Sequence, residues 1–342
     1  SPGFMASWGQ QRTSAMRTSP YRPYKPKPEQ LELMPAVSGN TINGVGETRP
    51  RRPARIYWHE PDKIEHGELQ KWFYTQHADN AAVNAARAAR ARILDIELPP
   101  VSAEPLQQSA ADWSDQLADF TGTLDMELFG ITAFKPEWAY EGERIDFRWV
   151  IMIGVAHDYE QIRTAPQPTA GAEVVRQYGR ANKAAKDIAA WIRRRGWDAA
   201  PHAGPMAGQM LLIPPALECG FGELGKHGSI INRDYGSSFR LAAILTNVPL
   251  LPTPREKYGV DDFCHRCQVC SNACPPEAIL PEKVRVRGTL KWYVDFDKCI
   301  PFFNENLGCG ICIAVCPWSI PGRGPRIVEQ LRRRASRKSR RG

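Results

Sequence analysis

The sequence predicts a mixed α/β (α+β) body followed by a small cysteine-rich domain. Three observations carry this prediction. Helical and strand-like patterns alternate up to about residue 255, eight of the nine cysteines fall between residues 264 and 316, and both ends of the chain are rich in basic residues. No apolar run reaches the ~18 residues of a membrane-spanning helix, so we expect no membrane span.

Composition divides the 342-residue chain into four parts. Residues 1–56 are rich in Pro, Arg, Ser and Gly without a hydrophobic period, which indicates an extended arm. Residues 57–255 form the body, 256–320 the cysteine-rich domain and 321–342 a basic tail. The net charge of +8 lies at the two ends, and the tail has eight Lys and Arg from residue 326 onward against one Glu. The tail lacks interleaved aromatic residues, so we expect a solvated tail rather than a nucleic-acid site.

Three helices are predicted in the body from the spacing of apolar residues. The first covers Ile64–Ile96, and we expect the arginines of its Ala- and Arg-rich run on a solvated face. The second covers Asp112–Phe129, where four apolar residues share one face: Trp113, Leu117, Phe120 and Leu124. The third covers Glu173–Arg195 and ends at Gly196, a residue suited to the backbone conformation that follows a helix.

The strands are predicted from short apolar runs bounded by turn residues. Arg148–Val155 has the length of a buried strand, and Trp197–Pro201, Ser229–Ile231 and Leu241–Thr246 are further extended segments. Met210–Ile213 is short and apolar, and a helical turn after it leads to Cys219. We interpret Cys219 as a small buried hydrophobic residue. Because helices and strands alternate, the body is expected to surround a sheet.

The cysteine spacing predicts two [4Fe–4S] clusters. The run Cys264-x2-Cys267-x2-Cys270-x3-Cys274-Pro matches the bacterial two-cluster ferredoxin pattern, and Cys299-x9-Cys309-x2-Cys312-x3-Cys316-Pro moves only its first cysteine upstream. In that pattern the fourth cysteine of a run ligates the other cluster. We therefore assign one cluster to Cys264, Cys267, Cys270 and Cys316, and the second to Cys274, Cys299, Cys309 and Cys312. Disulfides would need an oxidising compartment, and CxxCxxC triplets do not suit zinc.

A glycine-rich stretch precedes the cysteines. Residues 220–228 hold four glycines, and the turn-rich stretch Gly204–Gly208 lies upstream. Such loops let the backbone approach a large flat or phosphate-bearing ligand closely, although an ordinary turn-rich connection explains the same composition. The stretch is not followed by the βαβ unit of a dinucleotide site and is not a P-loop, so we expect neither a nicotinamide nor an ATP site.

Several stretches together resemble the reductive dehalogenases. They are Val150–Pro166, Gly222–Gly228, Asp234–Leu250 and the segment from Lys291 to Pro317. The resemblance covers about residues 112–320, and the related epoxyqueuosine reductases share the glycine stretch and both cysteine runs. Both families use cobalamin. The resemblance therefore implies a cobalamin-binding, nitroreductase-like core ahead of a ferredoxin-like domain, with the cobalamin base-off and without a protein lower ligand.

The resemblance also implies site residues. Cobalamin contacts are expected from Gly204, Gly222, Glu223, Gly225, Lys226, His227, Gly228 and Tyr235. Tyr178 corresponds to the family's tyrosine by order and context, and Arg240 stands where the family has its basic partner. A phenol holds its proton at neutral pH and releases it to a developing carbanion, and a nearby cation lowers a phenol's pKa. Helical tyrosines are often packing residues and Arg240 would also suit Asp234, so structural roles remain open.

The favoured function is the reductive dehalogenation of a small organohalide, in particular a halogenated phenol or other aromatic, by a cobalamin-dependent oxidoreductase. One alternative is a cobalamin and iron–sulfur reductase of the epoxyqueuosine reductase type, which acts on tRNA. Another is a non-catalytic iron–sulfur electron-transfer subunit. The sequence shows no twin-arginine signal, so it resembles the soluble catabolic members, and we expect a cytoplasmic protein. Its electrons would come from a separate ferredoxin, flavodoxin or reductase, for which the basic tail is a docking candidate.

Overall fold

The fold is known from a computed structural model that describes residues 19–204 and 208–339. Parts of the predicted arm, of the Gly204–Gly208 stretch and of the basic tail fall on residues 1–18, 205–207 and 340–342, which lie outside the described residues. Within the described ranges, no helix combines the length and the apolar character needed to cross a membrane.

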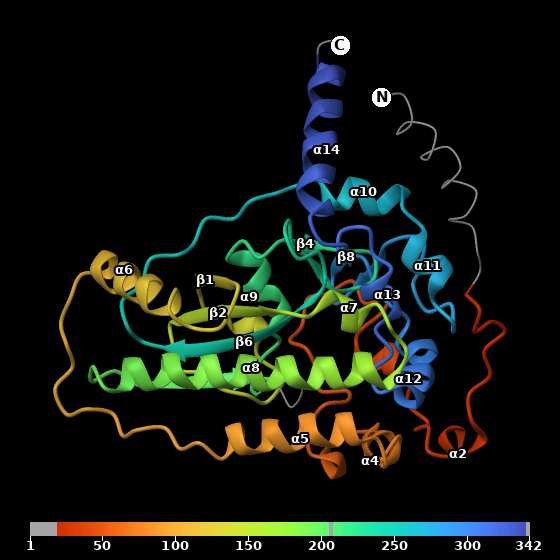
Figure 1. Ribbon diagram of the computed structural model, residues 1–342, viewed down its shortest axis with the longest axis horizontal. Helices are drawn as coiled ribbons and strands as arrows, with labels where there is room; N and C mark the ends of the chain where they lie inside the picture. Colours follow the sequence, from red (N-terminus) through yellow and green to blue (C-terminus); the bar gives the residue numbers. More distant parts are fainter. Residues whose placement is uncertain (1–18, 205–207, 340–342) are drawn as a thin grey trace.

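A four-stranded antiparallel sheet organises the body (Figure 1). The strands lie in the spatial order β1 (Leu128–Ala133), β2 (Trp149–Ala156), β6 (Phe239–Thr246) and β3 (Ala199–Ala203). Strands β2 and β6 are central and largely buried, which explains their continuous apolar runs. Alternate residues serve opposite faces: Ile151 and Ile153 belong to one core, and Val150 and Met152 to the other.

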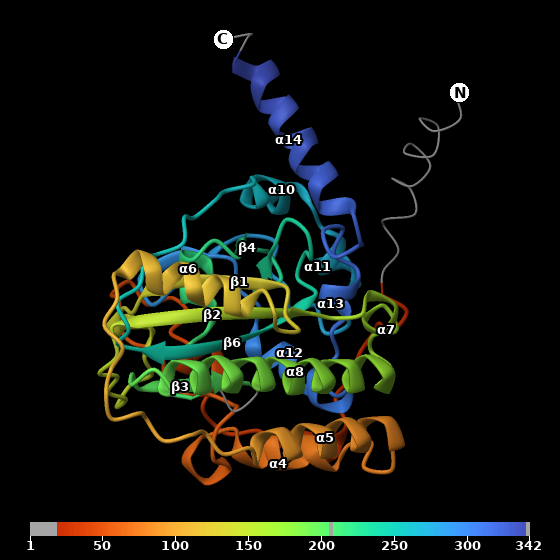
Figure 2. The ribbon, with the colours of Figure 1, turned by 60° about the vertical axis from the view of Figure 1, so that its left-hand side comes forward.

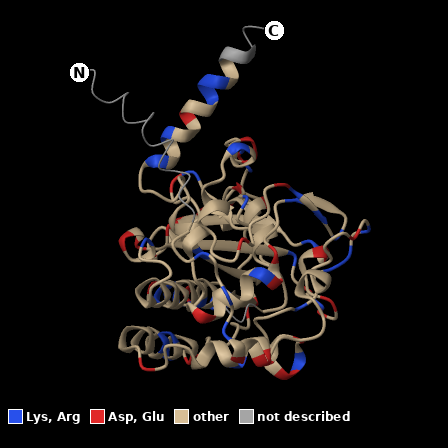
Figure 3. Cartoon of the chain, turned by 90° about the vertical axis from the view of Figure 1, so that its right-hand side faces the viewer, with Lys and Arg blue, Asp and Glu red and all other residues tan. Residues whose placement is uncertain are grey.

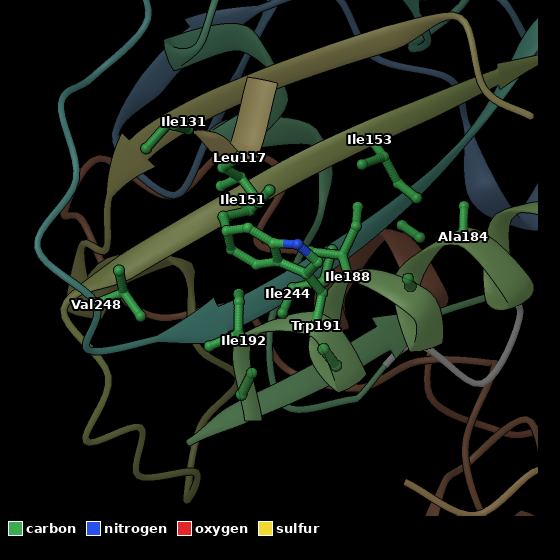
Figure 4. Packing of buried hydrophobic residues seen from close by; sticks show 14 of the residues in the cluster. Leu117, Ile131, Ile151, Ile153, Ala184, Ile188, Trp191, Ile192, Ile244 and Val248 are labelled. Atoms are coloured by element: carbon green, nitrogen blue, oxygen red, sulfur yellow. The ribbon is translucent and has the colours of Figure 1, made fainter. Parts of the chain in front are cut away.

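Helices α6 (Ala110–Thr121) and α8 (Pro168–Arg193) cover one face of the sheet (Figure 2). Ile188 and Ile192 of α8 pack against the isoleucines of β2 and β6 (Figure 4). Trp191 joins the two helices, because its ring meets Trp113 edge-on at 5.7 Å and stacks on Phe120 at 5.3 Å. Helix α5 (Ala81–Leu94) packs along the side of α8 that faces away from the sheet (Figure 1).

The opposite face carries a second apolar core. It is covered by η3 (Pro136–Trp138), by α9 (Ile213–Glu218) and by the hairpin of β4 (Glu223–Leu224) and β5 (Ile230–Ile231). Cys219 is 1% exposed within this core, as predicted for a small buried residue.

The cysteine-rich domain consists of short elements wrapped around the cysteines. In chain order they are α10 (Val260–Arg266), α11 (Val269–Ala273), β7 (Val284–Val286), β8 (Thr289–Lys291), α12 (Phe296–Glu305) and α13 (Ile311–Ala314). The longer helix α14 (Arg323–Ser339) follows in the basic tail. Helix α7 (Tyr159–Ile162) of the body contacts α13.

The described part of the N-terminal arm packs against this domain. It contains α2 (Pro28–Leu31) and α3 (Gly39–Ile42), and η2 (Pro61–Lys63) and α4 (Gly67–Thr75) follow it. Arg22 donates to the carbonyl oxygen of Cys274 at 3.0 Å and pairs with Glu277 at 2.8 Å. The ring of Tyr24 meets Phe302 edge-on at 4.9 Å. The arm is therefore bound to the cysteine-rich domain by both ionic and aromatic contacts.

All three predicted helices have different limits in the structure. The helix predicted over 173–195 is α8, which begins five residues earlier, at Pro168, and ends at Arg193. The segment 64–96 is not one helix but α4 and α5, because the chain turns between them at His77, whose φ is +52°. The helix predicted over 112–129 ends at Thr121, and Leu128 already belongs to β1. Leu124 keeps its apolar role, since it packs against the same core from the connecting loop.

The basic tail is helical over the described residues. Ile327, Val328 and Leu331 lie on one face of α14 and pack with Trp318 and Val260. This apolar face explains why a strongly basic segment adopts a helix against the body. Beyond this contact the helix projects from the molecule beside α10 (Figures 1 and 2).

Candidate active site

Tyr178 and Arg240 reach one cavity from different elements. Tyr178 lies in the first half of α8, and Arg240 is the second residue of β6. In β6, Arg240 alternates with Ala242 and Ile244, which pack on the α8 side of the sheet. The strand register therefore directs Arg240 toward α8. Its Cζ atom lies 5.2 Å from the centroid of the Tyr178 ring, within the range of a cation–π contact.

The cavity has a volume of about 240 Å³. Tyr178, Arg240 and Gly204 line it together, and the hydroxyl-bearing Ser229 and Ser237 lie in its wall. Most of its remaining described lining is apolar, and no carboxylate is among the described residues that line it. The cavity therefore combines an apolar wall, a phenol and a cation, which suits an aromatic ligand with negative charge.

Gly204 makes room for the tyrosine ring. A Cβ atom on this residue would lie 2.7 Å from Cε1 of Tyr178. The carbonyl oxygen of Gly204 accepts a hydrogen bond of 3.0 Å from Nη2 of Arg90, a residue of α5. Arg90 is half-buried, and burial lowers the pKa of its guanidinium. The sequence interpretation placed these arginines on a solvated face and missed Arg90, because nothing in its spacing shows that α5 packs beside α8.

His157 lies close to Arg240, which lines the 240 Å³ cavity. His157 is 7% exposed, and its Nδ1 lies 3.3 Å from the hydroxyl oxygen of Ser238. Burial and the charge of Arg240 hold the pKa of His157 well below its usual value, so this imidazole is neutral. The Nε atom of Arg240 is buried and has no hydrogen-bond partner among the described residues. Asp234, the suggested structural partner, instead pairs with Arg233 at 3.0 Å.

A second cavity, of about 390 Å³, adjoins the first. Tyr140 and Leu211 line both, and Cys299 lies in the wall of the second. A small third cavity is bordered by Arg240, Cys309 and Ile313. The residues of the candidate active site are therefore adjacent to the cysteines that were assigned to the second cluster.

The glycine stretch forms the tight β4–β5 hairpin. A Cβ on Gly222 would lie 2.1 Å from the carbonyl oxygen of Ile231, and one on Gly225 would lie 2.6 Å from the side chain of Ile231. Gly228 has φ +77°, which favours glycine. These glycines therefore have a structural explanation within the hairpin, and they are not among the described residues that line the 240 Å³ cavity.

Three polar residues predicted as cofactor contacts have partners elsewhere. The carboxylate of Glu223 accepts from the backbone N–H groups of Tyr258 and Gly259 at 2.9 and 3.0 Å, at the start of α10. His227 is buried, its Nε2 lies 3.1 Å from the hydroxyl oxygen of Ser237, and burial lowers its pKa to about 4. His227 thus reaches the wall of the 240 Å³ cavity only through Ser237. Tyr235 packs against the second apolar core.

The first cysteine set converges on one small cavity. Cys264, Cys267, Cys270 and Cys316 all line it, together with Lys226 and His227. The backbone N–H of Lys226 donates to Sγ of Cys264 at 3.5 Å. Burial, and then the charges of Cys264, Cys270 and Cys267, raise the pKa of Cys316 to about 12. These thiols would need a bound cation to become thiolates, and the spacing predicts that the iron of a [4Fe–4S] cluster fills this role.

Three cysteines of the second set, Cys274, Cys299 and Cys312, belong to one cluster that also contains Cys270 of the first set. Burial, followed by the charges of Cys309 and Cys274, raises the pKa of Cys299 to about 12. The pKa of Cys312 is raised well above its usual value by burial, with the largest charge effects from Cys309 and Cys299. The backbone N–H of Ala278 donates to Sγ of Cys274 at 3.4 Å. Cys299 therefore lies near Cys309 and Cys274, but Cys270 of the first set also lies close to Cys312, so the division of ligands between the two clusters stays a prediction.

Comparison with known proteins agrees with these features. Residues 263–320 match the family described as a 4Fe-4S dicluster domain. The tetrachloroethene reductive dehalogenase of Dehalobacter restrictus is 35% identical over 208 residues, which is 57% of this chain and 37% of that protein. The epoxyqueuosine reductase of Leadbetterella byssophila is 31% identical over 121 residues, 30% of this chain and 35% of that protein.

The fold is also found in a solved structure. A reductive dehalogenase whose structure is described as suggesting a mechanism for B12-dependent dehalogenation superposes with a TM-score of 0.66. The match covers 96% of this chain and 49% of that chain at 21% identity. The chain thus spans about half of that protein and little more than a third of the curated dehalogenase. The resemblance to reductive dehalogenases and the expected fold class are both confirmed.

Proposed function

We propose that this chain is an oxidoreductase that removes the halogen from an organohalide, in particular a halogenated phenol. The observation that carries the proposal is the convergence of Tyr178 and Arg240 on one cavity beside the second cysteine set. The reaction is Ar–X + 2e⁻ + H⁺ → Ar–H + X⁻, which needs a proton donor and a source of electrons. The similarity to reductive dehalogenases supports the same assignment.

The two adjoining cavities fit a large cofactor. They share Tyr140 and Leu211, have mainly apolar walls and extend from Tyr178 to Cys299. We propose that residues 57–255 hold cobalamin there, with Gly204 in its surroundings, while residues 256–320 hold the clusters. When bound, the corrinoid would supply a strongly reducing cobalt centre. No histidine is among the described residues that line either cavity, which is consistent with the proposal that cobalamin has no histidine from the protein as its lower ligand.

The residues of the cavity would act on the substrate as follows. The hydroxyl of Tyr178 holds the proton that the substrate carbon receives when the halide leaves. The guanidinium of Arg240 lies over the Tyr178 ring and stabilises negative charge on the phenol oxygens of the tyrosine and of the substrate. Arg90 holds Gly204 in place against the same ring, so it is a positioning residue.

The charge distribution favours an electron donor that docks at α14. Four arginines of this helix are exposed, namely Arg326, Arg332, Arg333 and Arg334, and Arg333 pairs with Glu329 (Figure 3). The apolar side of the helix packs into the same cluster of residues as Cys264 and Cys316. We propose that a separate acidic donor, such as a ferredoxin or flavodoxin, docks here and reduces the first cluster.

Reconstitution tests the function directly. The full chain is loaded anaerobically with iron, sulfide and cobalamin and is then reduced chemically. Brominated phenols such as 3-bromophenol are added as substrates, and the released halide is measured. We expect about eight iron atoms per chain, bound cobalt, and one halide released per two electrons. If the chain binds cobalt and turns over epoxyqueuosine-containing tRNA but releases no halide, it acts as an epoxyqueuosine reductase instead. Full iron content without cobalt binding would favour an electron-transfer subunit.

The base-off proposal has its own spectroscopic test. The EPR spectrum of the Co(II) form reports an axial nitrogen as superhyperfine splitting into a triplet. We expect no such triplet. A triplet that persists in protein prepared with a corrinoid lacking its nucleotide base would show that a protein histidine is the lower ligand.

Docking at α14 is tested by charge reversal. The double variant Arg332→Glu/Arg334→Glu should slow reduction by an acidic ferredoxin at low salt and leave reduction by a small neutral reductant unchanged. The matched control is Lys63→Glu/Arg144→Glu, which changes the net charge equally at exposed sites outside α14. Equal slowing in both variants would show a general charge effect and contradict docking at this helix.

A further inference from the structure

A buried lysine without a polar partner lies at the first cysteine set. Lys226 is 1% exposed, and its Nζ has no hydrogen-bond partner among the described residues. It lines the same small cavity as Cys264, Cys267, Cys270 and Cys316. Its ammonium group lies over the face of Trp292, whose ring centroid is 5.0 Å away. A buried, unpaired ammonium group is costly unless negative charge lies nearby.

We infer that Lys226 is the internal counter-charge of the first cluster and raises its reduction potential. A cube held by four thiolates carries net negative charge, and reduction adds one more electron. The ammonium group of Lys226 therefore stabilises the reduced state more than the oxidised state. Net charge and solvent exposure are among the main determinants of such potentials. The inference rests on the proposed cluster ligands and is independent of the substrate.

This role differs from the corrinoid contact that the sequence suggested for Lys226. Its side chain shares a cavity with the first cysteine set, whereas the described lining of the 240 Å³ cavity does not include it. In the scheme above, the first cluster receives electrons from the donor. The ammonium group of Lys226 would make this cluster a better electron acceptor.

The chain provides a matched control on the same tryptophan. The ammonium group of Lys283 lies 5.3 Å from the Trp292 ring, yet it pairs with Asp261 at 2.6 Å. Its side chain is 30% exposed, and it is not among the described residues that line the cysteine cavity. Lys283→Met therefore removes a lysine at nearly the same distance from Trp292, but one whose charge is already neutralised.

The test is an EPR-monitored redox titration of the cobalamin-loaded chain. In Lys226→Met the potential of one cluster should fall by at least the equivalent of a tenfold change in its reduction equilibrium, which is about 59 mV for one electron. The other cluster should keep its potential. Lys226→Arg should stay near wild type, and Lys283→Met should change the equilibrium less than twofold. The same titrations are repeated with the Cys299→Ser substitution added. Because this change should damage the second cluster, a shift in potential that remains belongs to the first cluster.

Each outcome decides the inference. Two intact clusters with unchanged potentials in Lys226→Met, or an equal shift in Lys283→Met, would overturn it, while the proposed cluster ligands would stand. If the methionine variant loses the first cluster, Lys226→Gln replaces it as the neutral variant. Loss of the cluster in both neutral variants but not in Lys226→Arg supports a required positive charge. Loss of the first cluster in Lys226→Met, Lys226→Gln and Lys226→Arg alike would show that Lys226 has a packing role and would overturn the inference. A wild-type chain with fewer than two clusters would instead refute the ligand assignment.

Discussion

The guanidinium group of Arg240 lies over the ring of Tyr178, with Cζ 5.2 Å from the ring centroid. The two residues are 62 positions apart in the sequence. Tyr178 lies on helix α8 and Arg240 on strand β6, and they meet because α8 packs across β6. We propose that this phenol and this cation, which lie together in an otherwise largely apolar cavity, form a catalytic pair rather than a packing pair. The first predictions concern this relationship.

Tyr178→Phe keeps the ring and removes only the hydroxyl. Turnover of a halophenol should fall by roughly 10² or more, the usual scale for a positioned general acid. The ring still fills its place against Gly204, so cobalt and iron contents should remain unchanged. A fully loaded variant that releases halide at nearly the wild-type rate would end the assignment of Tyr178 as proton donor.

Arg240 is tested by comparing two substitutions. Arg240→Lys keeps a positive charge but loses the planar guanidinium, whereas Arg240→Ala loses both. We expect turnover to fall in the order wild type, lysine variant, alanine variant, with cofactor contents equal. Turnover near the wild-type level in both variants would show that neither the charge nor the guanidinium is needed, and Arg240 would then have only a packing role.

Gly204 is expected to control the position of the Tyr178 ring. In Gly204→Ala the new methyl group would lie 2.7 Å from Cε1 of Tyr178, so the ring must move. We expect turnover to fall roughly tenfold or more, because proton transfer depends on hydrogen-bond distance. Gly179→Ala is the matched control on α8, since its methyl group would have no contact closer than 3.5 Å. Equal turnover in the two variants would contradict this role of Gly204.

The cluster ligands are tested by cysteine replacement. The wild-type chain should bind about eight iron atoms in two cubes. Cys299→Ser should damage the second cluster and leave the first, so about half of the iron remains. Cys219→Ser, which changes a buried cysteine outside both sets, should keep all of the iron. Four or fewer iron atoms in the fully reconstituted wild type would refute the two-cube assignment.

The sequence predicted those parts of the molecule that depend on local spacing. The cysteine groups follow from ligand spacing, and β2 and β6 follow from their apolar runs. The role of Arg90 could not be predicted in this way, because it depends on the packing of α5 beside Gly204. The glycine stretch left two interpretations open, a ligand loop and an ordinary turn. The close approach of Ile231 gives Gly222 and Gly225 a structural explanation, and their contact with a cofactor stays a prediction.

Helix limits were missed for a related reason. Helical spacing continues across residues 76–80, but His77 adopts a left-handed conformation and separates α4 from α5. In the basic tail, the apolar residues Ile327 and Val328 are too few to predict a helix from periodicity. Their burial against Trp318 becomes evident only when the cysteine-rich domain is folded.

The last prediction concerns the pH dependence of stability and uses His66. This histidine is 0% exposed, its ring meets Phe296 at 5.0 Å, and neither ring nitrogen has a hydrogen-bond partner among the described residues. Burial lowers its pKa below the ordinary value of 6.5. Above pH 6.5 the imidazole is neutral in both the folded and the unfolded chain, so its contribution does not depend on pH.

Below pH 6.5 the unfolded chain binds a proton that the folded chain does not, so the free energy of unfolding must fall with decreasing pH. For one proton the slope is at most about 1.4 kcal/mol per pH unit, and it ends at the folded-state pKa. His66→Leu should remove the share of the slope that His66 contributes and keep the shares of the buried His157 and His227, so the loss of stability between pH 7.5 and 5.5, measured by anaerobic urea unfolding, should be smaller than in the wild type. His77→Asn, at an exposed histidine, should lose as much stability on acidification as the wild type. If His66→Leu loses as much stability on acidification as the wild type, then His66 does not contribute to the pH dependence of the unfolding free energy.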